Sequence, residues 1–430
     1  MGHDDSIIWR SSNLPSQYFR SLGWDAPVNI RKWLGGGRDS ASVSERQSLR
    51  YATVFILLLG AVSLFADMSY EGAKSISGSY LKTLGATAAT VALVSGFGEF
   101  IGYGWRVVSG HITDRTGRYW TIVVVGYAMN LLAIPLLAFT GDWYMVAILI
   151  VLERMGKAIR APARDAMLSH AAIKTGRGWA FGVQEALSSV GAMIGPVSIF
   201  LVFWAGGDYS MAFLLMGIPA LITLAVLYYT YTKYPKPQLM EPARPQEKAV
   251  LPRRFWLYAL AAAFMAAGYI DYPLVAYHIQ NRALGEEMVI PLLYALAMGA
   301  DAISAMILGK LFDRGGPKVL LLVIVPAAFF PVLAFSDSMI VIAAGMGLFG
   351  LGMGAQESIM RAVVADLAPV GRRATAYGYY NTVFGMFWFI GSLALGMLYD
   401  LSIPVMVAIS VGLQLVSVPL FLMFLRDKTV

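Results

Sequence analysis

Apolar residues recur in long blocks along nearly the whole chain after Arg50, and short polar stretches separate the blocks. Each block has about 20 residues, the length that an α-helix needs to cross about 30 Å of hydrocarbon. The pattern therefore predicts an all-α membrane protein with twelve transmembrane helices. We place these helices at residues 51–73, 87–109, 119–140, 143–168, 178–204, 209–231, 255–279, 288–311, 317–335, 338–366, 373–399 and 402–425.

The composition supports a membrane protein, because 58% of the 430 residues are hydrophobic and only 14% are charged. The absence of cysteine excludes disulfides and thiolate metal sites, and the four histidines are scattered along the chain. We therefore expect no metal and no cofactor. No catalytic His/Ser/Asp constellation and no ATP-hydrolysis motif occurs, so we expect a protein that is not an enzyme and draws its energy from a gradient.

Polar segments divide the blocks into two sets of six. The expected parts are a cytoplasmic tail at 1–50, a six-helix bundle at 51–232, a linker at 233–254, a second six-helix bundle at 255–425 and a short tail at 426–430. Lysine and arginine in loops stay on the cytoplasmic side, so the basic loops place both termini in the cytoplasm at the cell membrane. These loops also account for the net charge of +7, so we expect no nucleic-acid partner.

The two halves repeat each other at a spacing of about 200 residues. "GHITDRTGR" from Gly110 aligns with "GKLFDRGGP" from Gly309, and "RAPARD" from Arg160 aligns with "RAVVAD" from Arg361. Six spans return the chain to the side on which it began, so the copies are parallel repeats. The expected architecture is a pair of pseudo-symmetric six-helix bundles that face each other across a central cavity, as in many secondary transporters.

The segment "GHITDRTGRY" at 110–119 resembles the loop pattern G-x-L-x-D-R-x-G-R-[KR] of the major facilitator superfamily, with Tyr119 in place of a basic residue. "GAMIGP" at 191–196 is similar to the G-x-x-x-G-P pattern of its proton-driven exporters, although the glycine pair that commonly follows is absent. The resemblance implies transport by alternating access. It also implies gating residues beside the cytoplasmic loops: Gly110, Asp114, Arg115, Gly117, Arg118, Asp165, Asp313, Arg314 and Asp366.

"LERMGKAIRAPARDAML" at 152–168 places charged residues inside the fourth predicted helix. At 100° per residue, Glu153, Lys157 and Arg160 lie on one stripe. An ionised side chain at the centre of the bilayer costs at least about 2.5–3.5 kcal/mol, so the stripe is expected to face the interior of the bundle. In the same way Glu71 and Lys74 share one face of the first helix.

The charged residues at membrane depth are candidates for proton coupling or substrate binding. They are Asp67, Glu71, Glu99, Arg106, Glu153, Arg154, Lys157, Arg160, Glu185, Asp271, Asp301, Glu357 and Arg361. A carboxyl group that moves relative to an arginine can take up and release a proton, so we expect Glu99, which shares a helix with Arg106, or Glu153 to carry it. The alternative is that these residues form static ion pairs that fix the packing of the helices.

Polar aromatic side chains are candidates for the cavity wall. They and one amide are Tyr70, Tyr103, Tyr269, Tyr272, Tyr379, Tyr380 and Asn381. The alternative is an aromatic belt at the membrane interface, where tyrosine and tryptophan are enriched.

The sequence thus favours a secondary transporter that exports a small molecule in exchange for protons and works as a monomer in the lipid bilayer. One alternative is a proton-coupled importer of a small organic anion, motivated by the arginines and lysine at membrane depth. A second is a membrane sensor or scaffold that binds a ligand without moving it.

Overall fold

Long helices make up almost all of the chain that the structure describes. The computed structural model describes residues 43–426, apart from residue 176 and residues 237–250 and 368–372. The first half contains α2 (Val43–Thr83), α3 (Ala88–Thr116), α4 (Tyr119–Leu136), η2 (Leu137–Phe139), α5 (Trp143–Thr175), α6 (Arg177–Trp204) and α7 (Tyr209–Lys233). The second half contains α8 (Arg253–Gly268), α9 (Tyr272–Arg282), α10 (Val289–Gly315), η4 (Gly316–Lys318), α11 (Val319–Ala328), α12 (Phe330–Ala334), α13 (Met339–Ala355), η5 (Gln356–Met360), α14 (Arg361–Leu367), α15 (Arg373–Leu401) and α16 (Ile403–Arg426).

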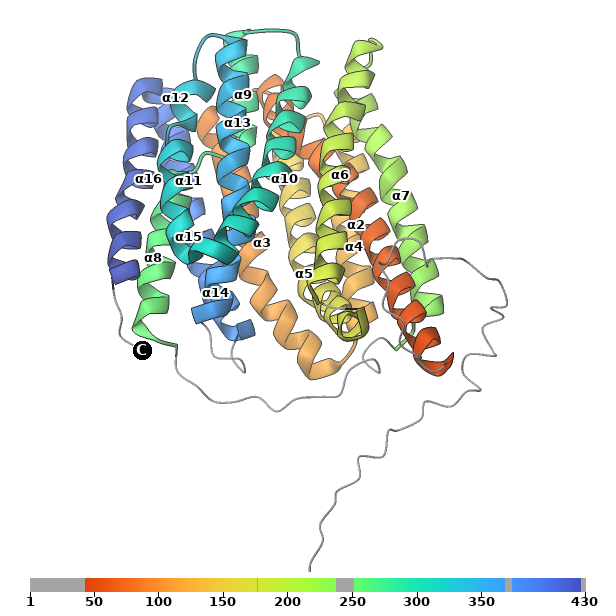
Figure 1. Ribbon diagram of the computed structural model, residues 1–430. Helices are drawn as coiled ribbons and strands as arrows, with labels where there is room; N and C mark the ends of the chain where they lie inside the picture. The colour runs from red at the N-terminus through yellow and green to blue at the C-terminus, as the bar shows by residue number, and fades with distance from the viewer. Residues whose placement is uncertain (1–42, 176, 237–250, 368–372, 427–430) are drawn as a thin grey trace, which may run out of the picture. The chain divides into compact units, whose positions relative to one another are not determined.

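Each of the twelve predicted spans coincides with one helix or with consecutive helices (Figure 1). Among the described residues, ten segments are long and apolar enough to cross a membrane. The two other predicted spans are α3 and α5, which are long enough but carry the charged residues discussed above. The structure is therefore consistent with twelve crossings. The first helix begins at Val43, before the predicted end of the tail at residue 50, and most of the predicted linker lies outside the described residues.

The backbone carries the internal repeat seen in the sequence. Gly117 ends α3 with φ 63°, and Gly316, its equivalent in the second copy, ends α10 with φ 62°. A positive φ is disfavoured for residues with a Cβ, and glycine is the common residue at such helix ends. Both copies of the motif therefore place glycine at a positive φ, but the turns differ, because ψ is 9° at Gly117 and −157° at Gly316.

The predicted span at 255–279 lies within one segment long enough to cross a membrane, but this segment is two helices, because the chain leaves the helix between Gly268 and Tyr272. The Asp271 carboxylate accepts a hydrogen bond of 2.9 Å from the backbone N–H of Tyr272 and so caps the start of α9. Pro273 follows in the first turn, where its missing N–H removes no helical hydrogen bond. These two residues favour a new helix start at this point.

The break exposes the backbone carbonyl of Gly268, and α16 provides its partners. Ser410 donates a hydrogen bond of 2.6 Å to this oxygen, and the Gln414 amide donates another of 3.1 Å. In hydrocarbon an unsatisfied backbone group costs several kcal/mol, so these bonds stabilise the interruption.

A second interruption lies in the predicted span at 338–366. Residues Gln356–Met360 form a π-helical turn between α13 and α14. Such turns contain one residue more than an α-helical turn and occur often at functional sites.

Several pairs of described helices join the two halves. Among them are α3 with α15, α6 with α10 and α3 with α9. Another pair is α2 with α9, which come so close at Gly78 that a Cβ there would collide with the carbonyl oxygen of Pro273. At the same end of the bundle, the backbone N–H of Ala89 donates 3.1 Å to the Asp400 carboxylate. The contacts at Gly78 and Ala89 hold the two halves together at the end of the bundle where α2 ends (Figure 1).

Replacing Gly78 with alanine is expected to weaken this closure, because overpacking of a tight contact costs about 1–3 kcal/mol. The melting temperature of the purified protein should fall. Gly104→Ala is the matched control, since a Cβ at Gly104 meets no atom within 4 Å. Alanine also favours a helix, so this control should melt at the same temperature or higher. Equal melting temperatures for the two variants would contradict the close contact.

Candidate functional site

Five charged side chains form a continuous buried network across the two halves. Lys74 on α2 contacts Asp271 at the α8–α9 break (3.1 Å) and Glu99 on α3 (3.5 Å). Arg154 on α5 contacts Glu99 at 3.4 Å and Glu153 at 3.6 Å. Only 4% of the Arg154 side chain and 3% of the Asp271 side chain are exposed, so water screens these charges little. The network contains three carboxyl groups and two cations, an excess of one acid.

Two further ion pairs lie beside the network and are balanced in charge. Lys157 on α5 contacts Glu71 on α2 at 3.8 Å, and Arg160 contacts Asp67 at 3.8 Å. Tyr294, on α10 of the other half, donates a hydrogen bond of 2.6 Å to the second oxygen of Glu71. Together with the Lys74–Asp271 pair, this bond makes the charged residues part of the contact between the halves.

Aromatic rings and an amide complete the surroundings of these charges. The ammonium group of Lys157 lies 3.8 Å from the ring centre of Tyr70, and the guanidinium of Arg154 lies 4.6 Å from it. Asn130 on α4 donates a hydrogen bond of 2.5 Å to the Glu153 carboxylate. Cations attract the faces of aromatic rings, and buried charges need hydrogen bonds, so these neighbours replace part of the hydration lost in the bilayer.

The structure brings together most of the charged residues that the sequence singles out in the first half. Glu153 contacts Arg154, but Glu99 contacts Lys74 and Arg154 and not Arg106. The Arg106 guanidinium lies instead over the ring of Tyr103, at 5.0 Å. The prediction paired charged residues that lie on the same helix. Most of the ion pairs observed among the described residues join different helices.

Three members of the site were not among the candidates. They are Lys74, Tyr294 and Asn130. Lys74 could have been found, because it shares a helical face with two acids at membrane depth. Tyr294 and Asn130 lie in apolar stretches with no neighbouring charge, so nothing in the local pattern distinguishes them from packing residues.

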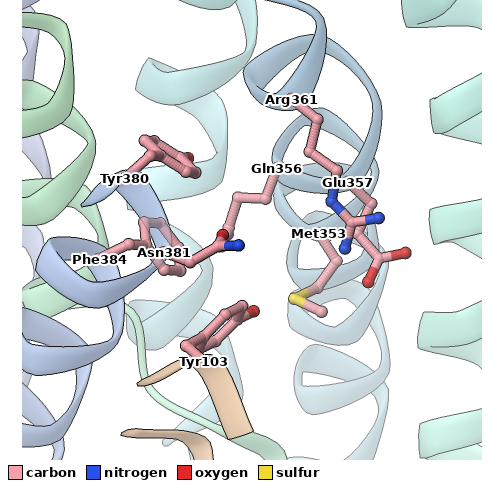
Figure 2. A pocket seen from close by; sticks show the side chains of 8 residues that line it. All are labelled: Tyr103, Met353, Gln356, Glu357, Arg361, Tyr380, Asn381 and Phe384. Atoms are coloured by element: carbon pink, nitrogen blue, oxygen red, sulfur yellow. The ribbon is translucent and has the colours of Figure 1, made fainter. Parts of the chain in front are cut away.

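A pocket lies between α3 and the helices α13–α15 (Figure 2). Its lining residues are Tyr103, Met353, Gln356, Glu357, Arg361, Tyr380, Asn381 and Phe384. The cavity between these side chains is small, about 20 Å³, which is room for about one water molecule. Two of the lining residues, Gln356 and Glu357, belong to the π-helical turn.

The polar aromatic candidates do not all reach this pocket. Tyr103, Tyr380 and Asn381 line it. Tyr269 and Tyr272 are buried in the core, where their hydroxyl groups donate to the backbone oxygens of Phe349 and Ile290. Tyr379 is 50% exposed and packs against Trp256, since neighbouring residues on a helix point about 100° apart and only Tyr380 turns inward.

The other candidates lie nearer to loops or open space. Arg164 pairs with its neighbour Asp165 at 2.8 Å on α5, and Arg115, Arg118 and Arg314 are exposed. Gly110 lies beside Pro162 of α5, so the loop motif is packed against that helix. The side chains of the remaining gating candidates, Asp114, Asp313 and Asp366, lie outside the described residues. Within the described part of the chain, no group of three or more His, Asp or Glu side chains could hold a metal ion.

Replacing Lys74 with methionine should destabilise the protein strongly. Removal of one partner from a buried ion pair leaves an uncompensated charge and costs about 3–5 kcal/mol. Adding Asp271→Asn to Lys74→Met should recover part of this loss, because Asp271 is the carboxylate that loses its cation, whereas Glu99 keeps its contact with Arg154. Denaturation of the two single variants and the double variant measures the coupling energy. Additive effects would contradict the contact at 3.1 Å.

Comparisons with known proteins agree with this architecture. The sequence model of the Major Facilitator Superfamily matches residues 56–336. A protein of Mycobacterium tuberculosis, described as uncharacterized, is 38% identical over 372 residues, which cover 84% of this chain and 91% of the relative. An uncharacterized MFS-type transporter of Methanocaldococcus jannaschii is 29% identical over 360 residues, which cover 81% of this chain and 89% of the relative.

Among solved structures, the nucleoside transporter NupG superposes with a TM-score of 0.67 at 10% identity. The superposition covers 87% of this chain and all of the other (100%), and at this identity it speaks for the fold alone. The family match extends over well more than half of the chain, and the long apolar helices are those of a multi-pass membrane protein. The protein belongs to the Major Facilitator Superfamily.

Proposed function

We propose that this protein exports a small molecule in exchange for protons, with the ion network of Asp271, Lys74, Glu99, Arg154 and Glu153 as the coupling site. The excess of one carboxyl group over cations carries this proposal. Three carboxylates beside two cations leave one negative charge uncompensated in a low dielectric, and one bound proton restores neutrality. The site can therefore hold one proton without leaving either cation unpaired.

Alternating access would change the affinity of this site for the proton. Lys74 belongs to the first half and Asp271 to the second, so separation of the halves at this end would pull them apart. Lys74 would then pair with Glu99 alone. The Asp271 carboxylate would lose its cation, so it would have to bind a proton or be hydrated by water. A change of conformation of this kind links proton binding and release to the movement of the halves.

The direction of transport is inferred from the segment "GAMIGP" and its place in the fold. A Cβ at Gly191 or Gly195 would collide with a backbone oxygen of α2, at Leu64 or Met68. The segment thus holds α6 directly against the helix that carries Asp67 and Glu71. Its similarity to the pattern of proton-driven exporters supports export over import of an organic anion.

The proposal is tested in proteoliposomes with an imposed pH gradient. A ligand is first identified by a thermal-shift panel, because a ligand stabilises the state that it binds. With an acidic interior, an antiporter accumulates this ligand inside as protons leave. With an acidic exterior, a symporter accumulates the ligand inside as protons enter. Accumulation only in the second case would overturn the proposed direction, and no accumulation in either case would favour a sensor or scaffold.

Glu99→Gln and Glu153→Gln are expected to reduce accumulation driven by the pH gradient, by about tenfold or more for the residue that carries the proton. An amide preserves the shape of the side chain but binds no proton in this range of pH. Ligand binding should persist in both variants. Glu286→Gln, at an exposed position between α9 and α10, is the matched control and should transport normally. Normal gradient-driven transport by both variants of the network would exclude these two carboxyl groups as carriers.

A further inference from the structure

One stripe of α2 makes its contacts with the second half of the protein. Glu71, Lys74 and Gly78 follow one another at spacings of three and four residues, so they lie on the same side of the helix. Lys74 forms its ion pair with Asp271, and Gly78 packs against the start of α9. Glu71 accepts the hydrogen bond of 2.6 Å from the hydroxyl group of Tyr294 on α10. All three contacts join the two halves, so movement of the halves apart at this end of the bundle would break them together.

Tyr294 is held in place by the second half. Only 2% of the residue is exposed, and its ring packs against the ring of Tyr272 with 4.5 Å between the ring centres. Tyr272 is fixed in turn, because its hydroxyl group donates to the backbone oxygen of Ile290, one turn before Tyr294 on α10. The packing of the second half therefore directs the Tyr294 hydroxyl at the Glu71 carboxylate of the first half.

The ion pair of Glu71 with Lys157 is more open to water than the pair of Asp271 with Lys74. The exposed fractions of the Glu71 and Lys157 side chains are 14% and 28%. Those of Asp271 and Lys74 are 3% and 9%. Water therefore reaches Glu71 more easily than Asp271, and it provides a route by which a proton can arrive at Glu71 and leave.

The charged neighbours of Glu71 divide between the two halves. Those of the first half stay beside it when the halves separate, and they are Lys74 and Asp67 on α2 and Lys157 and Glu153 on α5. Those of the second half, Tyr294 and Asp301 on α10, would move away. Asp301 acts on Glu71 only at longer range, whereas Tyr294 donates directly to the carboxylate. Loss of the Tyr294 hydrogen bond is therefore the larger change when the halves move.

We propose that Glu71 is a second proton-binding group of the transporter, and that Tyr294 is the positioning residue that links its affinity for the proton to the movement of the halves. While the halves are in contact, the Tyr294 hydroxyl stabilises the Glu71 carboxylate. When the halves separate at this end, the bond is lost and the carboxylate takes up a proton from the water that enters. When they close again, the bond forms and the proton leaves to water on the other side. This inference rests on the proposed function, because it adds a second proton to the same transport cycle.

The test is infrared titration of the carboxyl groups in the purified full-length protein in nanodiscs, without a ligand and without a pH gradient. Glu71→Gln should remove one titrating carboxyl band, because an amide binds no proton in this range of pH. Tyr294→Phe should shift the midpoint of this band upward by about one to two pH units, because the carboxylate loses a hydrogen bond that favours its ionised form. In the Glu71→Gln background, Tyr294→Phe should shift no band.

Tyr272→Phe is the matched control for Tyr294→Phe, since it removes another buried hydroxyl group from the second half and leaves the ring in place. Both variants should lower the melting temperature, because each loses a buried hydrogen bond. Only Tyr294→Phe should shift the midpoint of the Glu71 band. An unchanged spectrum for Glu71→Gln, an unchanged midpoint for Tyr294→Phe, or equal shifts in the two tyrosine variants would overturn the proposal.

The outcomes separate this inference from the proposed function. A midpoint shift specific to Tyr294→Phe, in a protein that transports no solute, would contradict the transporter and leave proton binding at Glu71 and its control by Tyr294 in place. Proton-coupled transport with the same pH dependence in the wild type, Glu71→Gln and Tyr294→Phe would overturn this inference and leave the proposed function in place.

Discussion

The need to neutralise charge inside a membrane determines the arrangement of the helices in this protein. Lys74, Arg154 and Arg160 are buried, Lys157 is partly buried, and each contacts at least one carboxylate from another helix. A buried cation that loses its partner is far more costly than a surface ion pair, so these contacts restrict which faces of α2, α3 and α5 can meet. The same need explains the position of Asp271 at the break between α8 and α9, because its carboxylate forms an ion pair with Lys74.

Much of the fold could be predicted from the sequence, because the length of apolar blocks and the polarity of loops are strong signals in membrane proteins. The repeated motif predicted loops after residues 109 and 311, whereas α3 and α10 continue through most of the motif and end at Thr116 and Gly315. The break at Gly268–Tyr272 was missed because the apolar residues on both sides add up to the length of one span, although Asp271 and Pro273 are residues typical of a helix start. The break is stabilised by an aspartate cap and by hydrogen bonds to Gly268 from α16. The two donors on α16 are 142 and 146 residues away in the sequence.

The candidate site was predicted less completely than the fold. Helical periodicity correctly predicts which charges share a face, as for Glu153, Lys157 and Arg160 on α5. It does not predict which helix that face meets, so the partner of Glu99 was sought on its own helix and lies on α2 and α5. The same limit applies to tyrosines. Tyr379 and Tyr380 are adjacent in the sequence and equally polar, yet only the packing of α15 decides which one faces the pocket.

The interruption between α8 and α9 has a mechanical consequence. The hydrogen bonds from Ser410 and Gln414 are made to Gly268, the last residue of α8, and none of these described bonds involves α9. The eleven residues of α9 are held by contacts of their own, because the Tyr272 hydroxyl donates to the backbone oxygen of Ile290 and His278 is hydrogen-bonded to Tyr399. Opening of this end of the protein would therefore have to break these contacts, the close approach of Pro273 to Gly78 and the ion pair of Asp271 with Lys74, while the bonds between α8 and α16 could persist.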